Sequence, residues 1–173
     1  MSYFYTNRRK KGMSDLVGSY ECTVDVKGRV MLPSAHKKAL QSELEKPFIL
    51  KRSVFGTCLE LHTISGWNKE MKQINKLNRF VKKNMQFIRA FTAGLKQIEI
   101  DSTGRLLLPK DLLLFAGITK DIVMLATSKN IIEIWDKKKY EEEVTLPGDQ
   151  FEGLAEDVMG SMGNEASEND ELS

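Results

Sequence analysis

The chain is poor in the residues from which metal sites and disulfide frameworks are built. Its 173 residues include only two cysteines and two histidines. The cysteines, Cys22 and Cys58, lie far apart in the sequence, which fits neither a zinc-binding spacing nor a set of disulfides. We therefore expect no metal and no other cofactor.

The sequence also lacks long apolar runs and the common motifs of catalysis. No run approaches the roughly 20 apolar residues that span a bilayer. The basic N-terminus has no apolar stretch behind its charges, as a secretory signal would have. A glycine-rich phosphate loop and a Gly-x-Ser-x-Gly motif are both missing. These absences favour a cytoplasmic protein that is not an enzyme, binds no small-molecule substrate and does not enter a membrane.

Basic residues are missing from the end of the chain. Residues 141–173 carry eleven acidic side chains and no basic one, whereas residues 18–140 carry 22 basic and 12 acidic ones, a net charge of +10. A core this basic favours a polyanionic partner such as nucleic acid. The alternative is an ordinary, well-solvated lysine-rich surface, and charge alone does not decide between the two.

The most informative feature that is present is an internal repeat. Residues 20–33 match residues 96–109 at a constant offset of 76. Farther along the chain the offset falls to 74 and then to 73, as expected where connecting loops differ in length. The later matches pair 48–50 with 122–124 and 57–61 with 130–134. The chain therefore contains two copies of one unit, which we name the first repeat (18–65) and the second repeat (94–144).

Each repeat is expected to form a strand, a turn, a second strand, a short helix and a two-stranded hairpin. In the first repeat, residues 20–24 and 30–32 are the predicted strands, and Pro33 opens a helix that runs to about Leu40. In the second repeat, Lys110–Ala116 is the matching helix and Gly117 its cap. The hairpins are predicted over 48–52 with 57–62 and over 122–126 with 131–135.

The segments outside the repeats differ in character. Apolar residues three or four apart predict helices over 66–93, broken near Asn78–Lys83, and we interpret their apolar face as core. Residues 1–17 form a basic N-terminal extension. Residues 145–173 are rich in small polar and acidic residues, which favours an acidic disordered tail. The four-residue spacing of Leu154, Val158 and Met162 leaves open a short helix that forms on a partner.

Both repeats contain an Asp-x-x-Gly-Arg turn. An aspartate at the first position accepts hydrogen bonds from backbone N–H groups a few residues ahead, which closes a tight turn. Glycine supplies the positive φ that other residues adopt only under strain. Asp25 and Gly28 in the first repeat, like Asp101 and Gly104 in the second, are therefore predicted to be structural residues of the turns.

The arginine that follows each turn leaves a rigid backbone, so its guanidinium loses little freedom on pairing with a phosphate or a guanine edge. We predict that Arg29 and Arg105 contact DNA, with Lys27 in the first turn and the hydroxyls of Ser102 and Thr103 in the second. Each turn is expected at the tip of a two-stranded hairpin, which is narrow enough for the major groove. The alternative is a common turn whose Asp–Arg pair is purely internal, but two equivalent copies in a basic core favour DNA.

The repeat also argues against catalytic or metal-binding roles for the few candidate side chains. A thiol or imidazole whose counterpart is an apolar residue is most simply a core residue. The alignment pairs Cys22 with Ile98, Cys58 with Ile131, His36 with Leu112 and His62 with Trp135.

Four segments carry a resemblance to a known family: Gly18–Glu21 with Asp25–Arg29, Arg89–Gly94, Glu99–Arg105 and Ile132–Trp135. Over about residues 18–144 the chain resembles the MraZ family of the AbrB/SpoVT swapped-hairpin superfamily. The resemblance implies an α+β fold in which two tandem swapped-hairpin β units form a barrel-like core, with added helices between and after them.

The resemblance also implies a function. It implies a transcriptional regulator that forms a ring-shaped homo-oligomer, associates with the nucleoid and binds repeated sites in double-stranded promoter DNA ahead of the division and cell-wall gene cluster. By position, Arg29 and Arg105 match the DNA-contacting arginines of the family. Many such turns on one rim would add weak contacts by avidity.

Three features depart from the family pattern: the extension 1–17, the segment Asn78–Lys83 in place of a shorter proline-containing turn, and the long acidic tail. Either Met13 is the natural start, or the basic run Arg8–Lys11 contacts phosphates. The tail could compete with DNA for the basic face. A second hypothesis therefore makes the chain an oligomeric interaction protein whose main partner is another protein, bound by the apolar helix face or by the tail.

Overall fold

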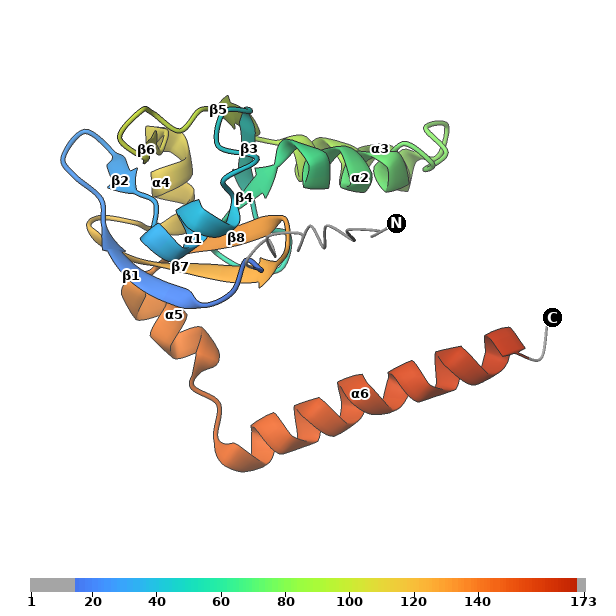
Figure 1. Ribbon diagram of the computed structural model, residues 1–173. Coiled ribbons are helices and arrows are strands. Elements are labelled where there is room, and N and C mark those ends of the chain that lie inside the picture. Colours follow the sequence, from blue (N-terminus) through green and yellow to red (C-terminus); the bar gives the residue numbers. More distant parts are fainter. Residues whose placement is uncertain (1–14, 171–173) are drawn as a thin grey trace, which may run out of the picture. The chain divides into compact units, whose positions relative to one another are not determined.

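The computed structural model describes residues 15–170 (Figure 1). The chain divides into two parts, one up to Lys137 and one from Lys138 onward. The predicted extension 1–17, with Met13 and the run Arg8–Lys11, falls almost entirely outside the described residues. The strands are β1 (Ser19–Thr23), β2 (Arg29–Met31), β3 (Phe48–Arg52), β4 (Leu59–Thr63), β5 (Lys96–Ile98), β6 (Arg105–Leu107), β7 (Asp121–Ser128) and β8 (Ile131–Asp136). The helices are α1 (Ser34–Ala39), α2 (Ile64–Ile74), α3 (Lys82–Thr92), α4 (Lys110–Ala116), α5 (Lys137–Val144) and α6 (Gly148–Asp170).

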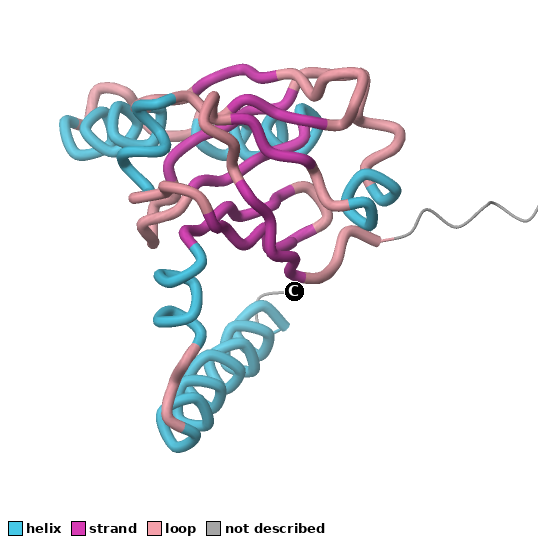
Figure 2. Tube along the Cα trace, turned by 90° about the vertical axis from the view of Figure 1, so that its left-hand side faces the viewer, coloured by secondary structure: helices cyan, strands magenta, loops and turns pink. Residues whose placement is uncertain are grey.

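The centre of the first part is an antiparallel sheet of six strands in the order β1-β7-β8-β4-β3-β5. The strands gather in the middle of this part in Figure 2, with helices around them. The two repeats interleave in the sheet, because β1 of the first repeat pairs with β7 of the second, and β5 of the second pairs with β3 of the first. The mixed α+β architecture is therefore confirmed, and each repeat depends on the other to complete its share of the sheet.

The register of the sheet relates the two repeats by approximate twofold symmetry. Glu60 and Glu133, which are equivalent at the offset of 73, face each other across β4 and β8. The pair Cys22–Ile122 between β1 and β7 has as its counterpart the pair Ile98–Phe48 between β5 and β3. The offsets of 76 and 74 relate these two pairs member by member. The alignment found in the sequence therefore agrees with the strand pairing.

The remaining two strands, β2 and β6, form a small antiparallel ribbon that is separate from the sheet. Val30 pairs with Leu106, its own equivalent at the offset of 76. The ribbon is extended at both ends by hydrogen bonds from Leu32 N to Gly104 O and from Leu108 N to Gly28 O. The ribbon therefore shares the twofold relation of the sheet and takes one strand from each repeat.

The ribbon corrects the expected position of the turns. The sequence analysis expects each Asp-x-x-Gly-Arg turn at the tip of a hairpin, but β1 pairs with β7 and β2 pairs with β6. After the turn hydrogen bond from Asp25 N to Arg29 O, the chain leaves β1 and enters the ribbon. The expectation is wrong because alternation of apolar residues identifies a strand without identifying its partner.

The expected barrel-like core also differs from the structure. Within residues 15–170 the six-stranded sheet is open, with β1 and β5 as its edges. A closed barrel would require hydrogen bonds between its first and last strands. The swapped-hairpin assignment remains a prediction, although the pairing of strands from different repeats is compatible with it.

Two apolar clusters hold the first part together. The larger one joins the inner sides of the sheet, the ribbon and α4, and it includes Leu32, Leu50, Leu112 and Ile134. The smaller one, with Ile49, Trp67, Ile74, Ile88 and Phe91 among its members, packs α2 and α3 against β3. The ribbon is therefore anchored to the main core.

The helices of 66–93 follow the prediction, including the break. The Thr63 Oγ1 accepts a hydrogen bond from Gly66 N at 3.1 Å and caps α2. Between α2 and α3, Asn78 Oδ1 accepts from Phe80 N at 2.9 Å, which stabilises a non-helical turn. In the second repeat α4 spans the predicted residues, and Gly117 ends it with φ +63°. Among the described residues, no helix is both long and apolar enough to cross a membrane.

The second part contains the rest of α5 and all of α6. A disordered tail is predicted from residue 145, whereas the structure describes α6 over 148–170. Phe151, Leu154, Val158 and Met162 recur at the spacing of one helix face, but all four side chains are exposed, so their burial does not account for the helix. The domain boundaries proposed from the sequence remain predictions.

Candidate nucleic-acid interface

The first turn is closed by the side chain of Asp25. Its Oδ1 accepts hydrogen bonds from Lys27 N and Arg29 N, both at 2.9 Å. The backbone adds a bond from Gly28 N to Asp25 O at 2.9 Å. These three bonds fix the backbone from Asp25 to Arg29, so the arginine enters β2 in a defined direction.

Gly28 is required in this turn for two reasons. Its φ of +82° lies in the left-handed region that favours glycine. A Cβ at this position would also lie 2.8 Å from the carbonyl oxygen of Leu108, the residue that directly follows β6 in the ribbon. The glycine therefore allows both the turn and the close approach of the two ribbon strands.

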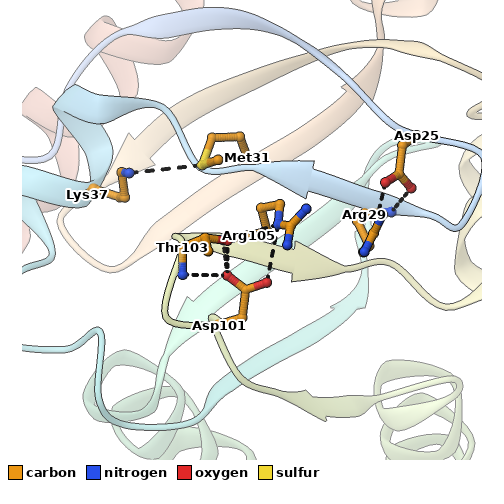
Figure 3. Close-up of polar contacts among 7 residues, drawn as sticks. All are labelled: Asp25, Arg29, Met31, Lys37, Asp101, Thr103 and Arg105. Atoms are coloured by element: carbon orange, nitrogen blue, oxygen red, sulfur yellow. Dashed lines mark hydrogen bonds and ion pairs between the residues drawn. The ribbon is translucent and has the colours of Figure 1, made fainter.

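The second turn repeats the geometry with additional bonds (Figure 3). Asp101 Oδ1 accepts from Thr103 N and Arg105 N at 2.9 Å, and also from the Thr103 hydroxyl at 2.6 Å. Gly104 has a φ of +84°. The second turn is therefore held by at least as many hydrogen bonds as the first. The structural roles of the two aspartates and two glycines stay predictions, with which this geometry is compatible.

Both arginines are held by one nitrogen and leave the others available. Arg29 Nε donates to Asp25 Oδ2 at 2.8 Å, and Arg105 Nε donates to Thr103 Oγ1 at 2.9 Å and to Asp101 Oδ2 at 3.3 Å. Their side chains are 37% and 36% exposed. Within residues 15–170 the terminal nitrogens of both arginines make no hydrogen bond, so four N–H-bearing nitrogens face possible ligands.

The two arginines lie on the same face of the ribbon. Arg29 is opposite Leu107, and Arg105 is opposite Met31. Directly paired residues, and residues two apart on one strand, point to the same side of a sheet. The other side carries Val30 and Leu106, each 1% exposed. With about 3.3 Å per residue along a strand and about 5 Å between strands, the Cα atoms of the arginines are about 8 Å apart.

The aspartates stay ionised at any physiological pH. Backbone and side-chain hydrogen bonds from Arg29 lower the pKa of Asp25. The Thr103 hydroxyl, followed by the Arg105 backbone, lowers the pKa of Asp101 to about 2. Each arginine therefore carries a fixed negative neighbour that orients the guanidinium and partly offsets its charge.

The other predicted contact residues divide into two groups. Lys27 and Ser102 are exposed at the tips of their turns, where they can reach a ligand. Thr103 is used internally, because its hydroxyl donates to Asp101 and accepts from Arg105. The sequence predicts this hydroxyl as a DNA contact, which stays a prediction. Its hydrogen bonds to Asp101 and Arg105 could not be predicted, because they depend on the rotamer that the turn imposes.

Three side chains that lie near the arginines were not predicted from the sequence to belong to this site. Met31 and Leu107 are exposed between the two arginines on the outer face of the ribbon. Lys37 on α1 approaches the ribbon, with its Nζ 4.0 Å from Met31 Sδ (Figure 3). The alternating pattern of β2 and β6 could have placed the apolar pair on this face. Nothing local to α1 points to Lys37, which reaches the ribbon through the tertiary fold.

The cysteines and histidines occupy structural positions. Burial raises the pKa of the Cys58 thiol to about 12, so this thiol is unreactive at neutral pH. His36 is fully buried and its ring lies edge-on to Tyr20. Among the described residues, no group of three or more potential ligands could hold a metal ion.

His62 belongs to a buried polar network at the centre of the sheet. Glu60 Oε2 accepts from Lys51 Nζ at 3.0 Å and lies 2.9 Å from His62 Nε2. Burial alone raises the pKa of Glu60, but hydrogen bonds from His62 and Lys51 outweigh burial and lower the pKa to about 2. The network is far more buried than the arginine pair, and we interpret it as structural.

The fold and the ribbon together define a class of protein: an α+β chain of two interleaved repeats that presents a twofold-related pair of arginines on a basic core. The family model described as "MraZ protein, putative antitoxin-like" matches residues 16–89 and 91–145. This chain belongs to the MraZ family.

Relatives in several bacteria match the chain over nearly their full length. A protein of Flavobacterium psychrophilum named transcriptional regulator MraZ is 56% identical over 153 residues, which cover 88% of this chain and 97% of that protein. A protein of the same name from Christiangramia forsetii is 56% identical over 149 residues, covering 86% and 96%. One from Pediococcus pentosaceus is 32% identical over 143 residues, covering 83% and 96%.

Proposed function

We propose that this protein is a DNA-binding transcriptional regulator, and that the outer face of the β2–β6 ribbon contacts the duplex through Arg29 and Arg105. The observation that carries the proposal is the placement of both arginines on one exposed face, with their terminal nitrogens unused within residues 15–170. The names of the relatives support the same function.

The ribbon suits the major groove in size and chemistry. Two strands about 5 Å apart fit a groove about 12 Å wide. An arginine whose Nε is already bound to an aspartate is preoriented, so its terminal nitrogens can bind a guanine edge or a phosphate with less loss of freedom. Met31 and Leu107, between the arginines, offer apolar contact to thymine methyl groups.

Substituting each arginine tests the proposal. We expect Arg29→Ala and Arg105→Ala each to weaken binding to a promoter duplex by about 1–3 kcal/mol, or about 5- to 150-fold. The measurement is fluorescence anisotropy of the full chain with labelled DNA over a salt series, since phosphate binding is lost as salt rises. The matched control is Arg79→Ala, which removes the same charge from an exposed position between α2 and α3. Parental affinity in both ribbon variants would refute the role of these arginines.

We further propose the finer points that the family resemblance implies. The chain would act at the nucleoid as a ring-shaped homo-oligomer of swapped-hairpin units on repeated sites ahead of the division and cell-wall genes. Lys27 and Ser102 would add contacts at the turn tips, and Thr103 would act through Arg105. Native mass spectrometry with and without a fragment of that promoter tests the assembly. A monomer that binds a single site would contradict the ring.

A second candidate function is an oligomeric interaction protein whose main partner is another protein. The observation in its favour is the row of exposed apolar side chains on α6, which includes Phe151, Leu154 and Val158. Deleting residues 146–173 separates the two functions. Unchanged DNA binding together with the loss of a protein partner would favour the second candidate.

A further inference from the structure

The twofold relation of the ribbon is broken at charged side chains: at the turn tips, where Lys27 corresponds to Thr103, and over the second turn, where Lys37 of α1 lies. A Cβ built on Gly104 would lie 2.7 Å from Lys37 Cδ and 2.8 Å from its Nζ. The aliphatic stem of the lysine therefore lies directly over the backbone of the second turn. Its Nζ is also 4.0 Å from Met31 Sδ, which places the ammonium at the border of the arginine face.

The equivalent position in the second repeat carries no charge. At the offset of 76, Lys37 corresponds to Leu113 on α4. Leu113 takes the same place over the first turn, because its Cδ1 lies 3.6 Å from a Cβ built on Gly28. The same packing site over each turn glycine is thus filled once by an apolar side chain and once by a cation. Packing alone does not account for the charge.

A hollow of about 340 Å³ opens beside Lys37 and the second turn. Its lining includes the exposed Ser102, whose hydroxyl makes no hydrogen bond within the described part of the chain. Two carboxylates also line it, Asp101 and Glu45. Asp101 is occupied by the turn, where Thr103 and Arg105 donate to it. No carboxylate within residues 15–170 forms an ion pair with Lys37.

We propose that Lys37, together with the Ser102 hydroxyl, binds a backbone phosphate of the duplex beside the second turn. The proposal rests on the proposed DNA-binding function and adds a residue to that surface. A lysine ammonium is a compact charge that suits phosphate, whereas the flat guanidiniums of Arg29 and Arg105 suit base edges. The counterpart Leu113 offers no such contact, so a phosphate contact from the short helix is expected beside the second turn and not from α4 beside the first.

Three substitutions in the full chain test the proposal. Lys37→Met keeps an unbranched apolar stem over Gly104 and removes the charge, whereas Lys37→Arg keeps a charge. Lys38→Met is the matched control, because Lys38 is the exposed neighbour on the same helix. Each variant is titrated with a mixed-sequence duplex, because a phosphate contact does not depend on sequence.

The readout is the dependence of log affinity on log salt. We expect Lys37→Met to lower the steepness of this line by about 0.9, the value of one phosphate contact. Between about 50 and about 200 mM salt, the ratio of the parental DNA affinity to the affinity of Lys37→Met should therefore decrease about 3.5-fold. Lys37→Arg and Lys38→Met should retain the parental slope. A parental slope in Lys37→Met, or an equal decrease in Lys38→Met, would overturn the assignment.

Two further observations separate this inference from its alternatives. If the parent itself shows no salt-dependent binding to duplex DNA, the proposed function fails and the inference falls with it. If the parent binds and Lys37→Met keeps its slope, only the inference fails. Inorganic phosphate at matched ionic strength should leave the thermal midpoints of parent and Lys37→Met equally unaffected. Stabilisation of the parent alone, without a change of slope, would assign the hollow to a free anion instead.

Discussion

At the scale of single residues, the aspartate of each turn decides how its arginine is presented. The carboxylate of Asp101 accepts from two backbone groups, from the Thr103 hydroxyl and from Arg105. The same bonds that hold the loop also orient the guanidinium. The proposed DNA contact of Arg105 therefore depends on side chains that do not themselves reach the duplex.

The pKa of Asp101 gives a test of this role. Hydrogen bonds from Thr103 and Arg105 lower it from 3.8 to about 2. Because the folded protein holds Asp101 ionised more readily than the unfolded chain does, the ionised carboxylate stabilises the fold at any pH above about 4. This stabilisation is lost as the pH falls from about 4 to about 2 and the carboxylate becomes protonated. We expect Asp101→Asn to lower the urea midpoint near neutral pH, with the difference from the parent closing over that range. The exposed Glu99, replaced by Gln, is the control, and a difference independent of pH would contradict the prediction.

The buried ion pair of Lys51 with Glu60 should contribute more to stability than the exposed pair of Arg105 with Asp101. Lys51 is 1% exposed and Glu60 is its ion-pair partner. We expect Glu60→Gln to lower the free energy of unfolding by about 3–5 kcal/mol, because it leaves a buried charge unpaired. Urea denaturation measures the change.

The twofold relation supplies the control for this prediction. Glu133 faces Glu60 across the sheet, and its Oε2 accepts one hydrogen bond, from Trp135 Nε1 at 2.8 Å. Glu133→Gln should cost no more than about 1 kcal/mol, because the amide oxygen of glutamine can still accept from Trp135 Nε1 and no buried charge loses its partner. If the two substitutions cost the same, the network around Lys51 does not carry the energy that its burial implies.

At the scale of elements, the two turns differ in what they pack against, although their backbones are alike. A Cβ on Gly28 would meet the Leu108 carbonyl at 2.8 Å, whereas a Cβ on Gly104 would meet the flexible Lys37 side chain. We expect both Gly→Ala variants to be destabilised by more than about 1 kcal/mol because φ is positive in both. Gly28→Ala should be the worse of the two, since a ribbon carbonyl cannot move aside. Equal urea midpoints would show that strain in φ alone matters.

The elements also show what the sequence could and could not predict. The helix α4 with its cap Gly117, the two hairpins and the break between α2 and α3 were predicted, because each depends on local spacing and turn residues. The pairing of β2 with β6 was not predicted, because Val30 and Leu106 are 76 residues apart. The alternation of apolar and polar residues identifies a strand but not the strand with which it pairs. Lys37 was missed for the same reason, since only the tertiary fold brings α1 to Gly104.

At the scale of the whole molecule, charge is divided between the basic core and the acidic C-terminal segment. Deleting residues 146–173 removes eight acidic residues and no basic one, which raises the formal charge from +2 to +10. We expect this variant to bind a mixed-sequence duplex more tightly and faster at low salt, because less negative charge repels the DNA. Anisotropy and stopped-flow mixing measure the two effects.

The dependence on salt distinguishes this effect from a specific contact. Repulsion across solvent is screened within about 10 Å at about 0.1 M salt. The gain should therefore shrink as salt rises and disappear at about 1 M. A gain that persists at high salt would mean that the segment acts by occupying the surface and not by its charge.

The interleaving of the repeats has a consequence for how the protein is made. Ser19 in β1 pairs with Leu125 in β7, so a strand that leaves the ribosome first waits for one that follows 106 residues later. At about 5–20 residues per second this wait lasts about 5–20 s. During that time the nascent first half exposes unpaired strand edges that a neighbouring polypeptide could join. The sheet of such a protein is therefore completed only after its second repeat has been synthesised.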